Sequence, residues 1–405
     1  MTKKTEQDLA SRIHDLANDL QPEAVAVRRY MHRNPELSFK EFKTAAYLAD
    51  QLKQIGIPFK SIAETGLLAE IEGQAGPGPT FALRSDHDAL PILEANEVPY
   101  KSQNLGIMHA CGHDVHTTCL LTAAKILWRV RGRFAGTIRL LFQPGEEKAP
   151  GGASIMIAEG ALQNPEPIGI IGQHVHPPLE VGKIGMRPGL YMASTDELYL
   201  TIHGKGGHGG IPQSTVDPIA ISAQVISALQ QLVSRQADPT MPTVLTFGKI
   251  ESVGGANNVI PNAVKLEGTL RTHNEEWRTE MCQRIGTTAS GIAEALGGRA
   301  ELNITKGYPY LENDEDLTRA VFADAQAYLG PENVVELPPR MTGEDFSFYS
   351  HQIPACFYRL GTGNQAKGIT SPVHTDTFDV DEACLEVGSG MMAWLAIKQL
   401  QRNAD

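Results

Sequence analysis

The alternation of helical segments with short apolar runs constrains the fold of this 405-residue chain more than any other feature. TIRLLFQP at 137–144 is almost wholly apolar, and PIGIIGQHVH at 167–176 is a second such run, as expected of buried parallel strands. A helical stretch at about 115–130 precedes the first run, and residues 66–73 and 79–86 have the pattern of two further strands. Strands that alternate with helices predict an α/β fold.

The pattern changes after residue 195, where half-exposed strands and two helices follow. The predicted elements are a strand at 196–206, a helix at about 218–235, strands at 243–252 and 263–272, a helix at about 274–296 and a strand at 299–307. This β-α-β-β-α-β order is that of a ferredoxin-like module. Because helix and strand signals resume from about residue 314, we expect a discontinuous catalytic domain at 1–187 and 306–405 around an inserted domain at 188–305.

Charge and cysteine usage exclude several classes of partner and compartment. The net charge of −12 argues against a nucleic acid or an anionic membrane as partner. The five cysteines are odd in number and scattered, which suggests a reducing compartment and at least one working thiol. The N-terminal stretch has no apolar region typical of a signal peptide, and no long apolar run spans a membrane. We therefore expect a cytoplasmic protein.

Four short motifs carry residues of the types that bind a borderline divalent cation such as zinc. They are HACGHD at 109–114, QPGEE at 143–147, GQHVH at 172–176 and PVH at 372–374. The adjacent glutamates after a Pro-Gly turn supply what such a metal needs for hydrolysis, since one carboxylate can bind it and the other can deprotonate water. The chain is therefore predicted to be a metal-dependent hydrolase.

Cys111 and His113 lie two residues apart, directly before a predicted helix. Gly112 between them lets the backbone turn so that both side chains can converge on one ion. A buried thiol beside a helix-capping histidine is the alternative interpretation. Asp114 is placed as a helix N-cap or as an acceptor that orients a ligand, whereas His116 shares the helical face of His113 or serves helix packing or the surface.

Glu146 and Glu147 follow a buried strand, at the carboxyl edge of the sheet where α/β proteins place functional groups. Two adjacent carboxylates repel each other unless a cation neutralises them, although a solvated acidic turn is a common alternative. His174 and His176 have strand spacing and so point to the same side. His374 is the fourth separate contributor, so the ligand candidates come from four segments of the chain.

DHDALP at 86–91 ends another predicted strand and adds Asp86, His87 and Asp88. By chemistry alone, any of these three side chains could bind a metal. His87 stands between two acids, which could equally need only a cationic or polar neighbour. The residues themselves leave both interpretations open.

Eight stretches of the chain, taken in order, strongly resemble the M20 metallopeptidase superfamily. They are RRYMHRNPELSFKE, ALRSDHDALPI, MHACGHDVHT, LLFQPGEE, GKGGHGGIPQSTVDPI, NVIP, GTLRT and GEDF. Within that superfamily the chain is similar to the amidohydrolase branch of N-acyl amino acid, hippurate and auxin-conjugate hydrolases. The resemblance implies a mixed-sheet α/β metallohydrolase domain with an inserted ferredoxin-like domain that acts as a lid and forms a homodimer.

The resemblance also implies a site for two divalent metal ions. The ligand positions of the branch fall here on Cys111, His113, Glu147, His174 and His374. Glu146 is then the general base, and His176 is not a ligand position. Asp86, Asp88 and Asp114 are expected to orient the ligands. Zinc, manganese, cobalt and nickel all suit this donor set.

Three residues of the inserted domain match positions that contact substrate in this branch. His208, in the glycine-rich turn, resembles a catalytic histidine that reaches the active site of a neighbouring subunit, although a mobile surface loop is the alternative. Asn258 and Arg271 resemble positions that hold the free carboxylate of the substrate, although Arg271 could instead form a surface salt bridge. Two departures from the pattern, His87 and MTGEDF at 341–346, bear on the shape of the substrate pocket.

The predicted chemistry is hydrolytic attack on a carbonyl, in which Glu146 takes a proton from water and returns it to the leaving amine. The leading hypothesis is cleavage of an N-acyl amino acid, a small-molecule substrate, to a carboxylic acid and an amino acid. A dipeptidase or carboxypeptidase is the alternative, with Glu344 and Asp345 as candidate anchors for a free amino group. An inactive binding protein is less favoured, because all the ligand positions and the base are present.

Overall fold

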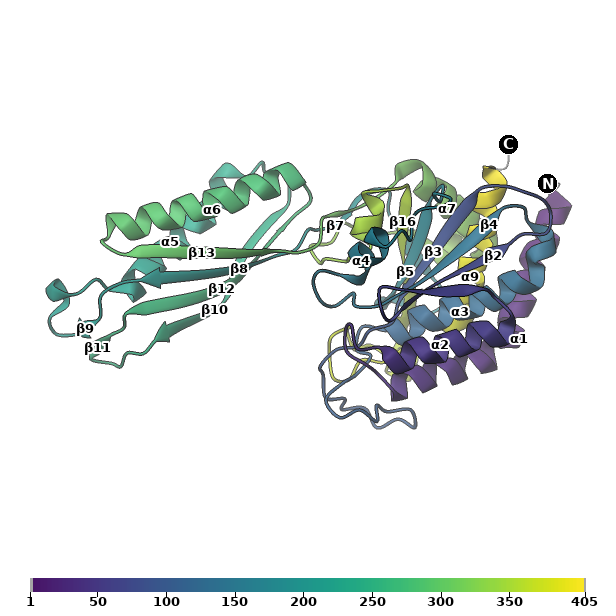
Figure 1. Ribbon diagram of the computed structural model, residues 1–405, viewed down its shortest axis with the longest axis horizontal. Helices are drawn as coiled ribbons and strands as arrows, with labels where there is room; N and C mark the ends of the chain where they lie inside the picture. The colour runs from purple at the N-terminus through teal and green to yellow at the C-terminus, as the bar shows by residue number, and fades with distance from the viewer. Residues whose placement is uncertain (1–2, 404–405) are drawn as a thin grey trace. The chain divides into compact units, whose positions relative to one another are not determined.

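The computed structural model describes residues 3–403, so residues 1, 2, 404 and 405 of the predicted catalytic domain lie outside the described part. The chain divides into two compact units (Figure 1). The first unit comprises Met1–Gly189, Glu312–Pro338 and Phe348–Asp405, and the second comprises Leu190–Leu311 and Pro339–Ser347.

Residues 339–347 depart from the predicted division, which assigned them to the catalytic domain. Backbone hydrogen bonds hold this segment to the second unit: Arg340 N donates to Tyr191 O at 2.8 Å, and Ala193 N donates to Thr342 O at 3.1 Å. Bonds between backbone groups leave no mark in the side-chain pattern, so the sequence did not reveal this return of the chain.

An eight-stranded mixed sheet forms the centre of the first unit, in the order β1-β2-β4-β3-β5-β16-β6-β15. The strands are β1 (Phe59–Ile62), β2 (Gly66–Glu72), β3 (Thr80–Asp86), β4 (Thr137–Gln143), β5 (Ile170–Glu180), β6 (Ile184–Met186), β15 (Val334–Glu336) and β16 (Ala355–Gly363). The neighbours β4-β3-β5-β16 run parallel, and every residue of β3 and β16 is buried. The predicted α/β class with a mixed sheet is confirmed.

Helices α1 (Lys3–Arg33), α3 (His113–Val130) and α9 (Cys384–Arg402) pack against one another, and α3 and α9 contact β3 (Figure 1). The core includes Leu83, Leu120 and Leu395, one from each of β3, α3 and α9. The other α-helices that lie wholly or mostly in the first unit are α2 (Phe42–Ile55), α4 (Gly152–Ala158), α7 (Glu315–Leu329) and α8 (Ser347–Ser350). Across residues 3–403, none of the helices has the length and apolar character needed to span a lipid bilayer.

The second unit contains a four-stranded antiparallel sheet in the order β10-β12-β8-β13. Its elements are β8 (Asp196–His203), α5 (Pro218–Gln231), β10 (Thr243–Val253), β12 (Ala263–Thr272), α6 (Glu275–Ala295) and β13 (Arg299–Lys306), with short strands β9 (Gly207–His208) and β11 (Val259–Ile260). Strand β8 alternates between buried and more exposed residues, as a sheet with one covered face requires. The ferredoxin-like order is therefore confirmed.

Local signals in the sequence account for the helix starts of the second unit. The Asp217 side chain caps α5 by accepting from Ile219 N, and Pro218 occupies the first helical position. The Asn274 side chain caps α6 by accepting from Trp277 N. Strands β7 (Gly189–Met192) and β14 (Leu311–Asn313), which contain two of the four division points of the chain, pair with each other.

Candidate metal centre

Three of the predicted motifs meet at one edge of the first unit's sheet. Asp86 is the last residue of β3, Gln143 is the last residue of β4, and His174 lies in β5. Because β3, β4 and β5 are parallel neighbours, their carboxyl ends lie at the same edge. The turn with Cys111 leads into α3, and the loop with His374 precedes α9. All five predicted ligands lie in the first unit.

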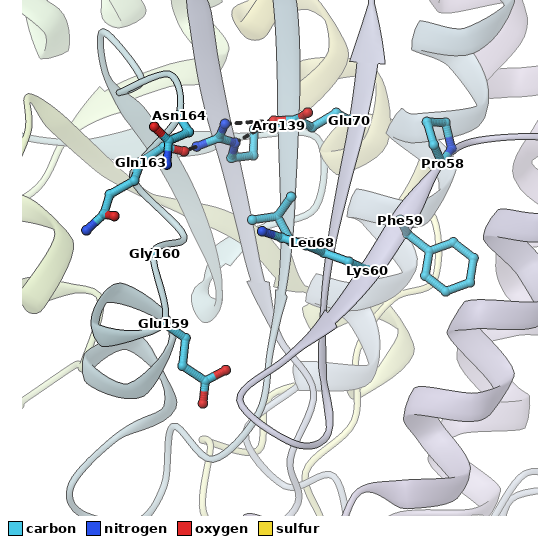
Figure 2. A pocket seen from close by; sticks show the side chains of 10 residues that line it. All are labelled: Pro58, Phe59, Lys60, Leu68, Glu70, Arg139, Glu159, Gly160, Gln163 and Asn164. Carbon is cyan, nitrogen blue, oxygen red and sulfur yellow. Dashed lines mark hydrogen bonds and ion pairs between the residues drawn. The ribbon is translucent and has the colours of Figure 1, made fainter.

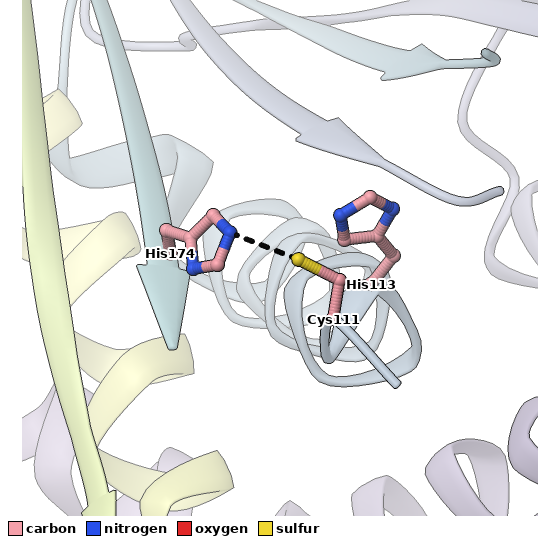
Figure 3. Close-up of side chains that lie close together, drawn as sticks. All are labelled: Cys111, His113 and His174. Carbon is pink, nitrogen blue, oxygen red and sulfur yellow. Dashed lines mark hydrogen bonds between the residues drawn. The ribbon is translucent and has the colours of Figure 1, made fainter. Parts of the chain in front are cut away.

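The donor atoms of these side chains approach one another closely. Cys111 Sγ lies 3.4 Å from His174 Nε2 and 3.3 Å from His374 Nε2. Glu147 Oε1 lies 3.3 Å from His374 Nε2 and 3.9 Å from His113 Nε2. Figure 3 shows Cys111, His113 and His174 gathered at the start of α3, with the Cys111 sulfur directed toward His174. Ligands that share a zinc-sized ion at about 2.0–2.3 Å stand roughly 3–4 Å apart, so the spacing fits.

Two of the groups that the donor atoms form overlap at Cys111. In one, the ligand atoms of Cys111, His113 and His174 all lie within 4.8 Å of one another, and in the other those of Cys111, Glu147 and His374 do. Cys111 belongs to both groups. Two groups with one shared thiol have the arrangement expected for two neighbouring ions.

Two properties of these side chains test whether they suit a cation. His113 Nε2 and Glu147 Oε1 are buried and have no hydrogen-bond partner among residues 3–403, which is rare for buried polar atoms. Burial, and then the charges of Glu147 and Glu146, raise the pKa of the Cys111 thiol well above its usual range. A divalent cation would give His113 Nε2 and Glu147 Oε1 a partner. It would also lower the pKa of the Cys111 thiol by stabilising the thiolate. The residues therefore fit a metal.

Asp88 holds two of the candidate ligands in place. Its Oδ1 accepts from His113 Nδ1 at 3.1 Å, which leaves His113 Nε2 directed to the donor cluster. Its Oδ2 accepts from the backbone N of Glu147 at 2.9 Å. Burial lowers the pKa of His113, but Asp86 and Asp88 outweigh this effect and together raise the pKa to about 10. The surroundings of this ring thus favour a positive charge, from a proton or from a metal.

His174 and His116 are held as neutral imidazoles by different contacts. His174 Nδ1 donates to Val175 O at 2.8 Å, which leaves the Nε2 lone pair facing Cys111. Burial, and then Arg359, lower the pKa of His174 well below its usual value, so the ring is in the form that binds metals. His116 Nδ1 donates to an Asp86 oxygen at 2.6 Å, and its Nε2 accepts from Val175 N at 2.9 Å. His116 thus supports the strand that carries His174, a role that its sequence spacing left open.

Backbone conformation also positions two of the ligands. Gly112 has a φ of 79°, and a Cβ there would lie 2.6 Å from a methyl group of Val175, so only glycine fits between Cys111 and His113. His374 has a φ of 64°, which is uncommon for a residue with a side chain. Its backbone N donates to Ala110 O at 2.8 Å and so ties this loop to the turn before α3.

Glu146, the predicted base, is 7% exposed and lies beside the donors. Its Oε2 is 4.0 Å from His113 Nε2. A carboxylate at this place can reach a water molecule held among the donors, as a general base must.

Asp114 has a different position from the one expected. Its Oδ2 accepts from Arg28 Nε at 2.9 Å and from His32 Nδ1 at 2.8 Å, in a fully buried ion pair with α1. Arg28 and His32 lie in the RRYMHR stretch, for which the sequence suggested no individual role. His87 is fully buried, and His176 is half-buried.

In the second unit, the structure brings His208 and Asn258 together. His208 pairs with Val259 between β9 and β11, and Gly209 N donates to Asn258 O at 2.8 Å. The backbone N of Gly210 donates to His208 Nδ1 at 3.0 Å. In the neutral ring this leaves the proton on Nε2 of an exposed side chain.

Arg271 lies at the opposite end of β12 from this pair. The residue beside it, Leu270, pairs with the first residue of β8, whereas Ala263 pairs with the last. The eight residue-to-residue steps from Ala263 to Arg271 span about 25 Å. The half-buried Arg271 guanidinium donates to Asp196 O at 3.3 Å and to Leu270 O at 2.9 Å. The other candidate anchors, Glu344 and Asp345, are buried in the segment 339–347.

A separate hollow of about 360 Å³ opens on the first unit beside β1 and β2 (Figure 2). Its buried cation, Arg139, already donates to Glu70 at 2.8 Å and to Ala161 O at 2.9 Å. This guanidinium is satisfied by the protein itself, so it is not available to bind a ligand in the hollow.

Comparison with known proteins identifies relatives of the whole chain. The sequence profile described as Peptidase family M20/M25/M40 matches residues 82–398. N-acetyl-L-cysteine deacetylase of Bacillus subtilis (strain 168) is 39% identical over 387 residues, 95% of this chain and 90% of the relative. Thermostable carboxypeptidase 2 of Saccharolobus solfataricus is 36% identical over 395 residues, 96% of this chain and 99% of the relative. The crystal structure of the Bacillus subtilis YXEP protein, a dinuclear metal binding peptidase from the M20 family, is 35% identical with a TM-score of 0.81, over 95% of this chain and 99% of that chain.

Proposed function

The chain belongs to Peptidase family M20/M25/M40, and on that premise we propose that it hydrolyses the amide bond of N-acyl amino acids with two divalent metal ions. One observation carries the proposal: five donor side chains from four segments converge beside a sixth residue, Glu146, that can act as a base. The donors are Cys111, His113, Glu147, His174 and His374. When bound, the ions would polarise the substrate carbonyl and lower the pKa of a nearby water.

The residues of the chain would divide the remaining work. Glu146 takes a proton from the attacking water and transfers it to the nitrogen of the leaving amine. Asp88 keeps His113 and the backbone of Glu147 in place during this transfer. His208 of a second copy would donate from Nε2 to the developing oxyanion, because its Nδ1 already accepts from Gly210 N.

The proposed substrate class is supported by the relatives and is consistent with two candidate carboxylate-binding residues. A relative that shares 39% of its residues is an N-acetyl-L-cysteine deacetylase, so an acylated amino acid is a fitting substrate. Arg271 and Asn258 are the candidates for holding the free carboxylate of such a substrate. A carboxypeptidase activity is the second candidate, because a relative that is 36% identical over almost its whole length carries that name.

The separation within the second unit supports a homodimer. His208 and Asn258 lie together, but about 25 Å of strand separates their end of the sheet from Arg271, so one small substrate cannot contact both ends within a single chain. A second copy would supply the missing group, as in the subunit arrangement that the sequence resemblance implied. Mixing Glu146→Gln and His208→Ala proteins tests this: two inactive variants should regain activity on forming mixed dimers, and continued inactivity of proven mixed dimers would contradict it.

The function is tested by amino acid release from a matched substrate panel, with and without chelator. The panel contains N-acetyl, N-benzoyl and indole-acetyl amino acids together with unblocked dipeptides. Chelator-sensitive release from the blocked substrates is the expected result. Release mainly from dipeptides would favour the peptidase, and no release from any substrate by metal-loaded protein would contradict both.

A further inference from the structure

The segment between α1 and α2 reaches the metal centre from outside the four motifs and outside the 82–398 region that the family profile matches. We propose that Glu41 in this segment is a positioning residue for the turn that carries Glu146 and Glu147, and that Ser38 positions Asp88 in the same way. We call Ser38 and Glu41 the N-terminal brace. This inference rests on the proposed function, because it assigns the brace to the machinery of that site.

Both oxygens of the Glu41 carboxylate accept hydrogen bonds. The side chain is fully buried. Its Oε1 accepts from Phe39 N at 2.8 Å and from Gly145 N at 2.9 Å, and its Oε2 accepts from Thr65 Oγ1 at 2.8 Å. Gly145 directly precedes Glu146, so one carboxylate ties the start of this turn to the segment before α2 and to the loop before β2.

Packing fixes the same turn from a second direction. Gly145 has a φ of 60°, and a Cβ there would lie 2.3 Å from Cε1 of the Phe39 ring. The carbonyl of Gly145 also accepts from Gly152 N at 3.0 Å. With its N–H held by Glu41, its carbonyl held by Gly152 and its face covered by Phe39, this residue has little freedom to move.

Ser38 acts on the candidate metal ligands through Asp88. Its Oγ donates to Asp88 Oδ2 at 2.6 Å, and the same oxygen accepts from Glu147 N at 2.9 Å. The other oxygen of Asp88 accepts from His113 Nδ1 at 3.1 Å. The Ser38 hydroxyl therefore sets the orientation of a carboxylate that holds one ligand by its ring and another by its backbone.

The shape of Glu41 matters more in this account than its charge. Burial, and then the neighbouring Asp88, raise the pKa of Glu41 above its ordinary value, although the hydrogen bonds from Thr65 and Phe39 act in the opposite direction. The position is therefore less suited to a charge than a solvated one. An uncharged side chain of the same length should therefore be accepted. Residues that hold metal ligands in orientation typically contribute about 10–100-fold to metal affinity or activity, which sets the size of effect to expect.

The decisive comparison is between Glu41→Gln, which keeps the length and loses the charge, and Glu41→Asp, which keeps the charge and loses the reach. We expect Glu41→Asp to lower kcat about 10–100-fold with KM changed far less, and to weaken zinc binding in a competition titration against a chelator by a similar factor. In Glu41→Gln, kcat and zinc affinity should both stay within about threefold of wild type, because the side-chain oxygen can still accept from Phe39 N and Gly145 N.

Two further variants separate positioning from a general loss of folding. Glu36, in the same segment, accepts from Thr44 N at 2.8 Å and from Thr44 Oγ1 at 3.0 Å, so its side chain supports the start of α2 and not the site. Glu36→Ala should lower the melting temperature while zinc affinity and kcat stay near wild type. Ser38→Ala, a milder change than any at Glu41, should weaken zinc binding without loss of the folded state.

The measurements on these variants test the N-terminal brace separately from the proposed function on which it rests. Normal kcat and zinc affinity in folded Glu41→Asp, or equal losses in Glu36→Ala, would overturn the brace and leave the proposed function standing. Loss in Glu41→Gln with retention in Glu41→Asp would show a role for charge and would also overturn it. A wild-type chain that neither binds zinc nor releases product would remove the proposed function, and the brace with it.

Discussion

In the first unit, ligand atoms of five side chains lie within a few ångströms of one another, and residues behind them hold several in position. In the second unit, the three residues expected to contact substrate lie at two separate places, and His208 is exposed. Bond cleavage needs groups that are already in position before the substrate arrives. Substrate recognition can instead be divided between distant segments that come together on one ligand.

The candidate ligands in the first unit also differ from one another in how far they are exposed to solvent. His174 is 8% exposed, whereas the side chain of His374 is 52% exposed. His374 is nonetheless tied down through its backbone N, which donates to Ala110 O. One candidate ligand at the open side of a mostly buried group would leave room for a substrate to approach bound metal ions.

The largest effect should follow from Glu146→Gln, which tests whether the first unit supplies the general base. Turnover should fall about 10²–10⁴-fold, because general base catalysis contributes on this scale. Metal content by elemental analysis should not change, since Glu147 and the other donors remain. Appreciable retained activity would remove Glu146 from the role of base and would weaken the contrast between the units.

Cys111→Ala should come next, because this thiol belongs to both groups of donors. Zinc affinity should fall by at least the roughly 10–100-fold that loss of an orienting residue costs, and activity should fall with it. Elemental analysis after gel filtration measures the stoichiometry. An unchanged metal content would show that the thiol is not a ligand.

Arg271→Ala probes the second unit and should have a smaller and more selective effect. KM should rise about tenfold or more for substrates with a free carboxylate, because a hydrogen bond to a charged group contributes about 1.5–3 kcal/mol. The amide analogues of the same substrates are the control and should lose much less. Equal losses on both sets would argue against a carboxylate clamp.

The smallest effect should be a difference in pH dependence between two buried ion pairs. In the first unit, the Arg28–Asp114 pair includes His32, whereas in the second unit Arg278 binds Asp196 at 2.7 Å without a histidine. Burial and Arg28 lower the pKa of His32, but Asp114 and Glu94 outweigh them and raise it above its usual 6.5.

A raised folded-state pKa contributes stability below the unfolded value of 6.5, and this stability is lost as pH rises through the higher folded value. As pH rises above 6.5 and through the higher folded-state pKa of His32, amide exchange in α1 should therefore become faster relative to α6, with a change of at most about 2–4 °C in melting temperature. His32→Gln should remove this difference. Equal pH dependence in wild type and His32→Gln would contradict the assignment.

Much of the molecule could be predicted because its signals are local. Apolar runs ending in Asp86 and Gln143 identified β3 and β4, and the alternation along 196–203 identified a strand with one covered face. The Cys, His and Glu residues of the four motifs, taken together, led to the prediction of a metal centre, because they are the ligand types of a borderline divalent cation.

Other contacts could not be predicted, because they join residues far apart along the chain. Asp114 was expected to orient a metal ligand, yet it binds Arg28, 86 positions earlier. The stretch with Ser38 and Glu41 was part of a familiar pattern, but nothing in it indicated that Glu41 would reach Gly145, 104 positions later. Hydrogen bonds of this kind depend on how whole elements pack, and periodicity carries no information about them.

The sequence by itself determined the class of fold, the β-α-β-β-α-β order of the second unit and the residue types available for metal binding, because periodicity and donor chemistry are properties of neighbouring residues. Only the tertiary structure decided which carboxylate faces which histidine, that His116 supports β5, and that Arg271 lies far from His208. These outcomes depend on directions and distances of a few ångströms, which are set when the sheet and its helices pack together.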